Sequence, residues 1–228
     1  MPPFARRAFV KLLCLADIHG EGAGLKDVLL RDGADADLIV LAGDLTHLGG
    51  RADAEEILAP LLASGIPLVA VAGNMDRDGA RGCLDEKGIN IHGRGIVQDG
   101  VGFMGLGGGT PSPFGTPWEI TELEAGAILA SGLPGISEAP YKVLVSHAPP
   151  RGTKLDRSFT GLHVGSEAVR GFLLDGAVDL CICGHIHESA GEDTVGRAHC
   201  VNIGPFKNGS YALIGIEGIG ARVTWRKL

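Results

Sequence analysis

Three near-continuous apolar segments dominate the first third of the chain, and each ends in aspartate or asparagine. They are VKLLCLAD (10–17), DLIVLAGD (37–44) and PLVAVAGN (67–74). Apolar runs without alternation are typical of strands that are covered on both faces, as in α/β sheets. Helix-length stretches at 24–33 and 51–65 separate these segments, which predicts βαβ units with parallel strands. We therefore expect an α/β fold with polar side chains gathered beyond the carboxyl ends of the strands.

The rest of the chain continues this pattern without a linker or a useful repeat. The segments YKVLVSHAPP (141–150) and VDLCICGHIHE (178–188) are again apolar runs with polar ends, and a β-rich tail follows. With 228 residues, of which 45% are hydrophobic, the chain can bury one sizeable core. We expect a single domain over residues 1–228. Further helices are expected near 78–87, 119–132 and 166–176.

Charge and composition disfavour several classes of partner. The net charge is −7 and no run of basic residues is present, which disfavours nucleic acid as a partner. No segment approaches the roughly 20 apolar residues that cross a bilayer. The first apolar stretch is interrupted by Lys11 and ends on Asp17, so we expect a strand rather than an export signal.

Four of the five cysteines lie in apolar segments, so we expect reduced, buried cysteines and a cytoplasmic location.

Ligand-type residues follow five of the apolar segments. A single Asp-x-His after a strand is more often a cap or a coincidence than a ligand pair. Nitrogen and oxygen ligands after five separate strands, flanked by glycines, instead favour one shared site. This mixture suits Mn, Fe or Zn, and the absence of cysteine from the motifs argues against a structural zinc site. The candidate ligands are Asp17, His19, Asp44, Asn74, His147, His185 and His187.

Five short motifs, DIHG, GDLTH, GNMD, SHAPP and GHIHE, occur in this order over residues 17–188. In these motifs the chain resembles the calcineurin-like metallophosphoesterases. The segments GLGGGTPSPFGTPWE and HVGS further resemble a branch related to cyclic-nucleotide phosphodiesterases. The resemblance implies a four-layer α/β/β/α sandwich of two mixed β-sheets flanked by helices.

The resemblance also implies a dinuclear, metal-dependent phosphoesterase that acts on a small phosphate mono- or diester. Two divalent ions about 3.5–4 Å apart suit such hydrolysis, and Mn, Fe or Zn would serve. A water between the ions loses a proton near neutral pH and attacks phosphorus as a metal-bridging hydroxide. The implied assignment gives one ion Asp17, His19 and His187, gives the other Asn74, His147 and His185, and lets Asp44 bridge both.

Met75 departs from the family pattern at the third motif. Many members have histidine there, and that histidine is thought to protonate the leaving oxygen or to clamp the phosphate. General acid catalysis is worth about 10²–10⁴-fold in rate. Either the leaving group departs unprotonated, or another residue supplies the proton, with His163 the first choice, or the site turns over slowly. Asp76 is expected to act in the site by orienting a neighbouring group, such as a ligand histidine.

Other interpretations stay open beside this one. A nuclease of the same fold is disfavoured by the acidic chain, and a non-catalytic scaffold usually loses ligands that are all present here. A regulatory protein that binds metal and phosphate with slow turnover is the third alternative. His47 either faces the pocket or lies on a solvated loop. The segment 107–110 either cradles phosphate with its N–H groups or is a glycine-rich turn of no special function.

Overall fold

The parallel arrangement expected for the first three strands is present in the computed structural model, which describes residues 9–228. β2 (Leu38–Ala42) pairs in parallel with β1 (Phe9–Leu15) on one side and with β3 (Leu68–Val71) on the other. The strand order is β11-β10-β1-β2-β3, so this sheet is mixed. β10 (Ser210–Glu217) pairs antiparallel with β1, and β11 (Gly220–Lys227) pairs antiparallel with β10.

The second sheet has six strands in the order β4-β5-β6-β7-β9-β8 and is also mixed. Its four central strands pair in parallel, while the strands at the two edges pair antiparallel with their neighbours. The strands are β4 (Gly95–Gln98), β5 (Val101–Leu106), β6 (Tyr141–Ser146), β7 (Leu180–Cys183), β8 (Gly191–Val195) and β9 (Ala198–Asn202).

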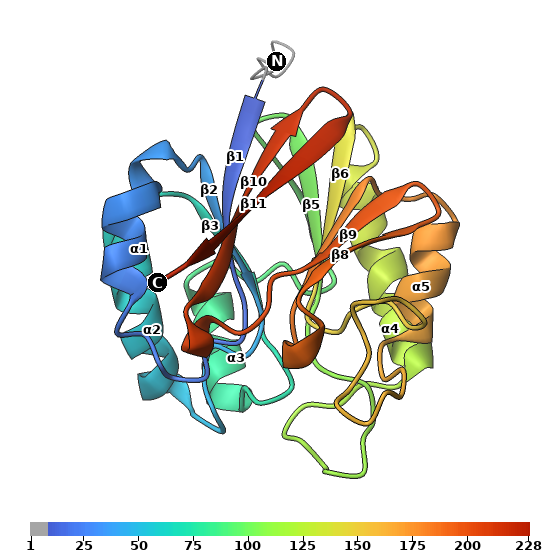
Figure 1. Cartoon of the computed structure of the whole chain (residues 1–228), viewed down its shortest axis with the longest axis horizontal. Coiled ribbons are helices and arrows are strands. Elements are labelled where there is room, and N and C mark those ends of the chain that lie inside the picture. Colours follow the sequence, from blue (N-terminus) through green and yellow to red (C-terminus); the bar gives the residue numbers. More distant parts are fainter. Residues whose placement is uncertain (1–8) are drawn as a thin grey trace.

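Helices cover the outer face of each sheet, and the two sheets face each other, as Figure 1 shows. This confirms the four-layer sandwich that the resemblance implied. Three helices cover the first sheet: α1 (Leu25–Asp32), α2 (Arg51–Ala63) and α3 (Asp78–Glu86). Two cover the second: α4 (Glu122–Gly132) and α5 (Glu167–Leu174). Short 3₁₀ turns connect other elements, namely η1 (Gly33–Asp35), η2 (Leu133–Ile136), η3 (His187–Ser189) and η4 (Phe206–Asn208).

Burial on both faces explains why the strand segments are almost continuously apolar. Leu12 and Cys14 of β1 face the second sheet and pack in one core cluster with Val143. Leu13 and Leu15 face the other way and pack in a second cluster with the covering helices. Alternate residues of a strand point to opposite faces, so a strand between two apolar layers needs both sets to be hydrophobic.

Side-chain caps set the start of the helices on the second sheet. The hydroxyl of Thr121 accepts from the N–H of Glu124, whose carboxylate accepts from the N–H of Thr121 at 2.8 Å. This capping box starts α4 at Glu122, three residues later than expected from the sequence. Ser166 caps α5 in the same position by accepting from the N–H of Val169 at 3.1 Å.

Two further findings concern membrane segments and cysteines. None of the helices described for residues 9–228 combines the length and the apolarity needed to cross a bilayer. All five cysteines are free and buried, in agreement with the expectation from their apolar surroundings.

Candidate metal centre

The candidate ligands lie where five strands end, at one edge of the two sheets. Asp17 and Asp44 follow β1 and β2 by two residues, and Asn74 follows β3 by three. His147 directly follows β6, and His185 follows β7 by two residues. The peptide N–H of His185 donates to Oδ2 of Asp17 at 2.9 Å, which joins the two sheets at this edge.

Several of these residues have a left-handed backbone conformation, which is costly for any residue with a Cβ atom. The described chain has six non-glycine residues with positive φ, and four of them are candidate ligands. The cost is about 1–2 kcal/mol for each residue, and such strain persists where the surroundings over-determine it. Its concentration here marks the strand ends as a functional site. The four are Asp17 (φ 52°), His19 (φ 51°), Asp44 (φ 49°) and His185 (φ 70°).

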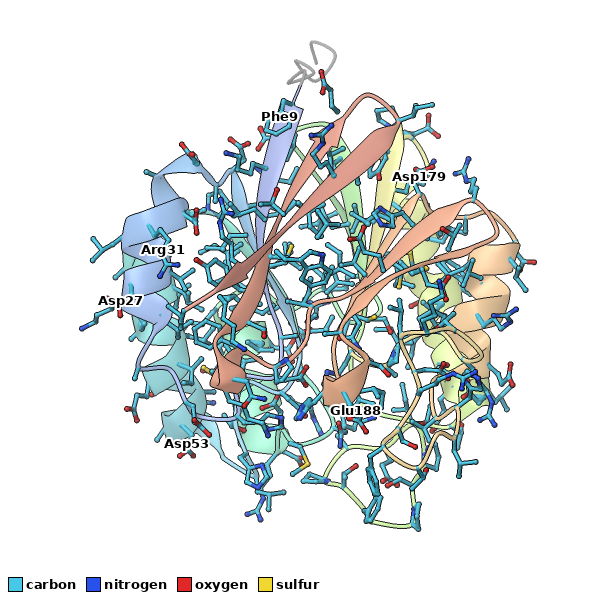
Figure 2. The ribbon with its side chains drawn as sticks, in the orientation of Figure 1. Phe9, Asp27, Arg31, Asp53, Asp179 and Glu188 are labelled. Atoms are coloured by element: carbon cyan, nitrogen blue, oxygen red, sulfur yellow. The ribbon has the colours of Figure 1, made fainter. Side chains whose placement is uncertain are left out.

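The first cluster consists of Asp17, His19 and His187, whose ligand atoms all lie within 4.8 Å of one another. Nε2 of His19 is 3.2 Å from Nε2 of His187, which in turn is 3.5 Å from Oδ1 of Asp17. His19 follows β1 of the first sheet and His187 follows β7 of the second, so this cluster lies at the junction of the sheets. Glu188, the residue after His187, is labelled in the lower half of the molecule in Figure 2.

The second cluster consists of Asp44, His147 and His185, whose ligand atoms also lie within 4.8 Å of one another. Asn74 belongs to the same group, because its Oδ1 is 2.9 Å from Nε2 of His147. The rings of His147 and His185 meet edge to face, with centroids 4.8 Å apart. The structure thus brings together the same residues that the resemblance assigned to the second ion.

Asp44 lies between the two clusters. Its Oδ2 is 3.7 Å from Nε2 of His19 in the first cluster and 3.5 Å from Nε2 of His147 in the second. Its Oδ1 accepts a hydrogen bond from the peptide N–H of Met75 at 2.8 Å. This bond fixes the carboxylate and leaves Oδ2 directed at both clusters, as a shared ligand requires.

The spacing of the ligand atoms fits bound ions. Two atoms that bind one ion at right angles, each at about 2.1 Å, lie about 3 Å apart. The separations of 3.2 Å between His19 and His187 and 2.9 Å between Asn74 and His147 agree with this value. Imidazole nitrogens with carboxylate and amide oxygens are a donor set for Mn, Fe or Zn.

Hydrogen bonding and charge determine which atom of His147 is free. Its Nδ1 is 2.9 Å from the carbonyl oxygen of Ala42, which can only accept, so Nδ1 carries a hydrogen and Nε2 faces the site. Burial opposes a charge on His147, but the Asp44 carboxylate outweighs it and raises the pKa of His147 to about 9. Burial likewise opposes the charge of Asp44, yet His147 lowers its pKa to about 2. An ion that binds at Nε2 of His147 therefore displaces a proton from that nitrogen.

The half-buried histidines His19 and His185 are neutral near pH 7. Burial lowers the pKa of His19 to about 4, although the carboxylates of Asp44 and Asp17 act in the opposite direction. Burial also lowers the pKa of His185 to about 4, with a further contribution from His147. Neutral imidazole is the form that binds metal, so these two side chains are ready as ligands.

Three motif glycines make room for ligands that come from other motifs. A Cβ atom on Gly43 would lie 2.2 Å from Nδ1 of His147, and one on Gly73 would lie 2.0 Å from Oδ1 of Asp44. A Cβ atom on Gly184 would lie 2.5 Å from Oδ2 of Asp17. Each glycine therefore precedes one ligand in the chain while allowing another to approach its backbone.

Asp76 braces the loops that carry Asp44 and Asn74. Its buried carboxylate accepts from the N–H groups of Gly73 at 2.9 Å and Thr46 at 2.8 Å, and also from Leu45 and the Thr46 hydroxyl. Burial and the nearby Asp44 raise the pKa of Asp76 to about 6. No histidine is among its hydrogen-bond partners in the part of the chain that the structure describes, so the expected contact with a ligand histidine is wrong: Asp76 orients the loops through their N–H groups and the Thr46 hydroxyl.

His163 pairs with a carboxylate outside the two clusters. Its Nδ1 is 2.7 Å from Oδ1 of the buried Asp156, which also accepts from the N–H groups of Gly152 and Thr153. The structure gives no contact between His163 and a candidate ligand within residues 9–228. Asp156 was not predicted from the sequence, although an aspartate three residues after a threonine in a polar loop is a turn signal.

The loop that carries His163 is nevertheless attached to the first cluster. The peptide N–H of Phe159 donates to the carboxylate of Glu188, which follows His187 in the chain. The hydroxyl of Ser189 donates to the carbonyl of Arg157 at 2.6 Å. His163 therefore lies on a loop held beside the turn that carries a candidate ligand, with about one third of its side chain exposed.

The structure also bears on two alternatives that the sequence left open, for His47 and for the segment 107–110. The ring of His47 meets the ring of His19 edge to face at 5.5 Å between centroids, so this exposed histidine lies beside the first cluster. The N–H groups of Gly107, Gly108 and Gly109 are already used by His92, Ala72 and Trp118. The phosphate cradle considered at residues 107–110 is therefore wrong for these three N–H groups.

Comparison with known proteins shows the family and agrees with the fold. The sequence model of a family described as calcineurin-like phosphoesterase matches residues 10–189. An uncharacterized protein of Methanocaldococcus jannaschii is 33% identical over 202 residues, which cover 86% of this chain and 89% of the relative. The crystal structure of TT1561 from Thermus thermophilus has a TM-score of 0.72 at 19% identity and covers 94% of this chain and 98% of that one. A dimetal phosphatase from Danio rerio has a TM-score of 0.63 at 13% identity, with 96% and 98% covered.

Proposed function

Because the chain belongs to the calcineurin-like phosphoesterase family, we propose that it is a two-metal hydrolase of a small phosphate mono- or diester. The observation that supports this most directly is the position of Asp44. One of its oxygens lies 3.7 Å from His19 and 3.5 Å from His147, and so reaches both clusters. A single metal site would not need a carboxylate held between two complete sets of ligands.

In the proposed centre, each side chain has a separate task. Two divalent ions, when bound, would activate a water molecule as nucleophile and neutralise charge on the phosphoryl oxygens. Asp44 is shared by both sites, and the N–H of Met75 and the rigid loop around Asp76 keep it in place. Manganese, iron and zinc all suit the donor set. One ion would be held by Asp17, His19 and His187, and the other by Asn74, His147 and His185.

The Met75 side chain has no proton to give to a leaving group, although its backbone is part of the site. Its N–H holds Asp44, and its carbonyl accepts from the N–H of Leu48 at 3.1 Å. We propose that methionine replaces a general-acid histidine at this position, so hydrolysis relies on an acidic leaving group or on a proton from elsewhere.

The substitution Met75→His should increase hydrolysis of esters with poor leaving groups. A correctly placed acid contributes about 10²–10⁴-fold, and we expect at least a tenfold gain in kcat for alkyl phosphates. Nitrophenyl esters should change by less than about threefold, because nitrophenolate departs without a proton. Steady-state kinetics on both substrate types measure the difference. Equal changes for both would refute the idea of a missing acid.

His163 is our proposed source of the proton. Asp156 occupies its Nδ1 and holds the ring in one orientation, which leaves Nε2 free to face a substrate. The same pairing of carboxylate and imidazole orients general acids in other enzymes. The contact between Phe159 and Glu188 holds the loop of His163 beside the turn that carries His187.

The substitution His163→Ala should therefore lower kcat by about 10²-fold for alkyl phosphates and remove one limb of the pH profile. Asp156→Asn should produce a smaller loss in the same direction. The matched control is His199→Ala, since His199 pairs with Glu192 on the second sheet. A rate and a pH profile that stay unchanged in the His163 variant would exclude this residue as the acid.

Met75 also favours a second candidate function. A site that holds two ions and phosphate but lacks an acid could bind a phosphorylated ligand with slow turnover. Screening the metal-loaded protein against nitrophenyl mono- and diesters, cyclic nucleotides and dinucleotides separates the two functions. We expect hydrolysis that a chelator abolishes and added manganese restores. Stoichiometric metal uptake without turnover on any substrate would instead support the binding function.

A further inference from the structure

His47 lies beside the first cluster but is not a member of it. Its ring meets the ring of His19 edge to face at 5.5 Å between centroids, and the ring of His19 meets that of His187 at 5.1 Å. The ligand atoms that lie within 4.8 Å of one another belong to Asp17, His19 and His187, without His47. A third imidazole is therefore held next to the candidate ligand rings while it remains outside the ligand set.

The turn that carries His47 is fixed to the third motif. The N–H of Thr46 donates to the carboxylate of Asp76 at 2.8 Å, and the N–H of Leu48 donates to the carbonyl of Met75 at 3.1 Å. Leu48 also has a left-handed backbone conformation, with φ 59°, which is costly for a residue with a Cβ atom. Because such strain persists where the surroundings over-determine it, the turn holds His47 in a fixed place beside the first cluster.

The ring of His47 has unused hydrogen-bonding capacity. Its side chain is exposed, and within residues 9–228 neither ring nitrogen has a hydrogen-bond or ion-pair partner. An imidazole carries at least one N–H in either protonation state, so it can always donate one hydrogen bond. The side chain of Met75, whose carbonyl holds this turn, has no N–H or O–H. His47 is therefore the side-chain donor that this part of the site offers to an anion.

We propose that His47 is a phosphoryl-binding residue, which donates its N–H to an oxygen of the substrate bound at the first cluster. This inference rests on the proposed phosphoesterase function. A hydrogen bond to a charged oxygen is stronger than one between neutral groups. Because His47 contacts the phosphoryl group and not the leaving oxygen, its contribution is similar for alkyl and nitrophenyl esters. This separates it from His163, whose proposed proton matters mainly for alkyl esters.

The test compares His47→Phe, which keeps an aromatic ring against His19 but removes the N–H, with His47→Gln, which supplies an amide N–H. In the manganese-loaded protein, His47→Phe should lower kcat/KM about 10- to 100-fold for alkyl phosphates and for nitrophenyl phosphate alike, as expected for the loss of a hydrogen bond to a charged group. His47→Gln should recover most of both activities. The matched control is His199→Phe, which makes the same change in β9, where His199 pairs with Glu192. This control should leave both rates unchanged.

A binding measurement provides a second readout that does not depend on turnover. Calorimetric titration with inorganic phosphate should show about tenfold weaker binding to the manganese-loaded His47→Phe variant, with the metal content unchanged. Unchanged phosphate affinity, a loss confined to alkyl phosphates, or no recovery in the His47→Gln variant would overturn the role of His47 while the wild type remains an active phosphoesterase. Loss of an ion from the His47→Phe variant would also overturn it, because His47 would then be a metal ligand. A wild type that binds neither manganese nor phosphate would instead overturn the proposed function, and this inference with it.

Discussion

Replacing Asp44 with asparagine is expected to remove the ability of the protein to hold two ions and to lower hydrolysis by about 10³-fold or more. One oxygen of this carboxylate lies near both clusters, at 3.7 Å from Nε2 of His19 and 3.5 Å from Nε2 of His147. Metal ions contribute several kcal/mol of transition-state stabilisation, and each 1.4 kcal/mol corresponds to about tenfold in rate. Asparagine keeps the shape and can still accept the N–H of Met75, so the fold should persist.

Metal analysis, steady-state kinetics and circular dichroism together check this result. The expected outcome is a folded protein with fewer than two ions per chain and very low activity. An Asp44→Asn variant that still binds two ions and hydrolyses esters within tenfold of the wild type would contradict a shared carboxylate. The substitution Asp53→Asn is a suitable control, because this carboxylate lies at the start of α2 and accepts from the N–H of Gly50.

The second large effect is expected for Gly73→Ala, which adds one methyl group to the third motif. The added Cβ would lie 2.0 Å from Oδ1 and 2.3 Å from the peptide nitrogen of Asp44. Because the loop around Asp76 holds both strand ends, Asp44 cannot shift without breaking hydrogen bonds. Overpacking of this kind costs about 1–3 kcal/mol of stability, and a ligand held wrongly lowers metal affinity by about 10–100-fold.

The matched control for this substitution is Gly126→Ala. Gly126 lies in α4 with no atom within 4 Å of the position of a Cβ, and alanine is preferred over glycine in a helix. Thermal unfolding should show a loss of stability for the first variant and none for the control. Titration with manganese should show weak binding only for the first variant. Equal metal affinity of both variants would show that the crowding at Gly73 does not matter.

The candidate ligand positions could be predicted from the sequence because all of them lie shortly after the ends of five strands. An apolar run that ends in Asp17 or Asn74 identifies both a buried strand and the group at its carboxyl end. The ends of these strands meet at one edge of the two sheets, so candidate ligands that are far apart in the sequence lie close together in the fold. The parallel order of β1, β2 and β3 follows from the same signals.

Other parts of the site depend on tertiary contacts that leave no local pattern. An orienting role was expected for Asp76, but only the folded chain shows that its partners include the N–H groups of Gly73 and Thr46. The pairing of His163 with Asp156 likewise depends on the course of a long loop.

The most direct test of a shared two-metal centre is anomalous diffraction from crystals grown with manganese. The proposal predicts two anomalous peaks about 3.5–4 Å apart, with Asp44 in contact with both. One peak should be surrounded by Asp17, His19 and His187, and the other by Asn74, His147 and His185. Anomalous maps without peaks at these side chains, or with a single ion that Asp44 does not touch, would contradict the proposed centre.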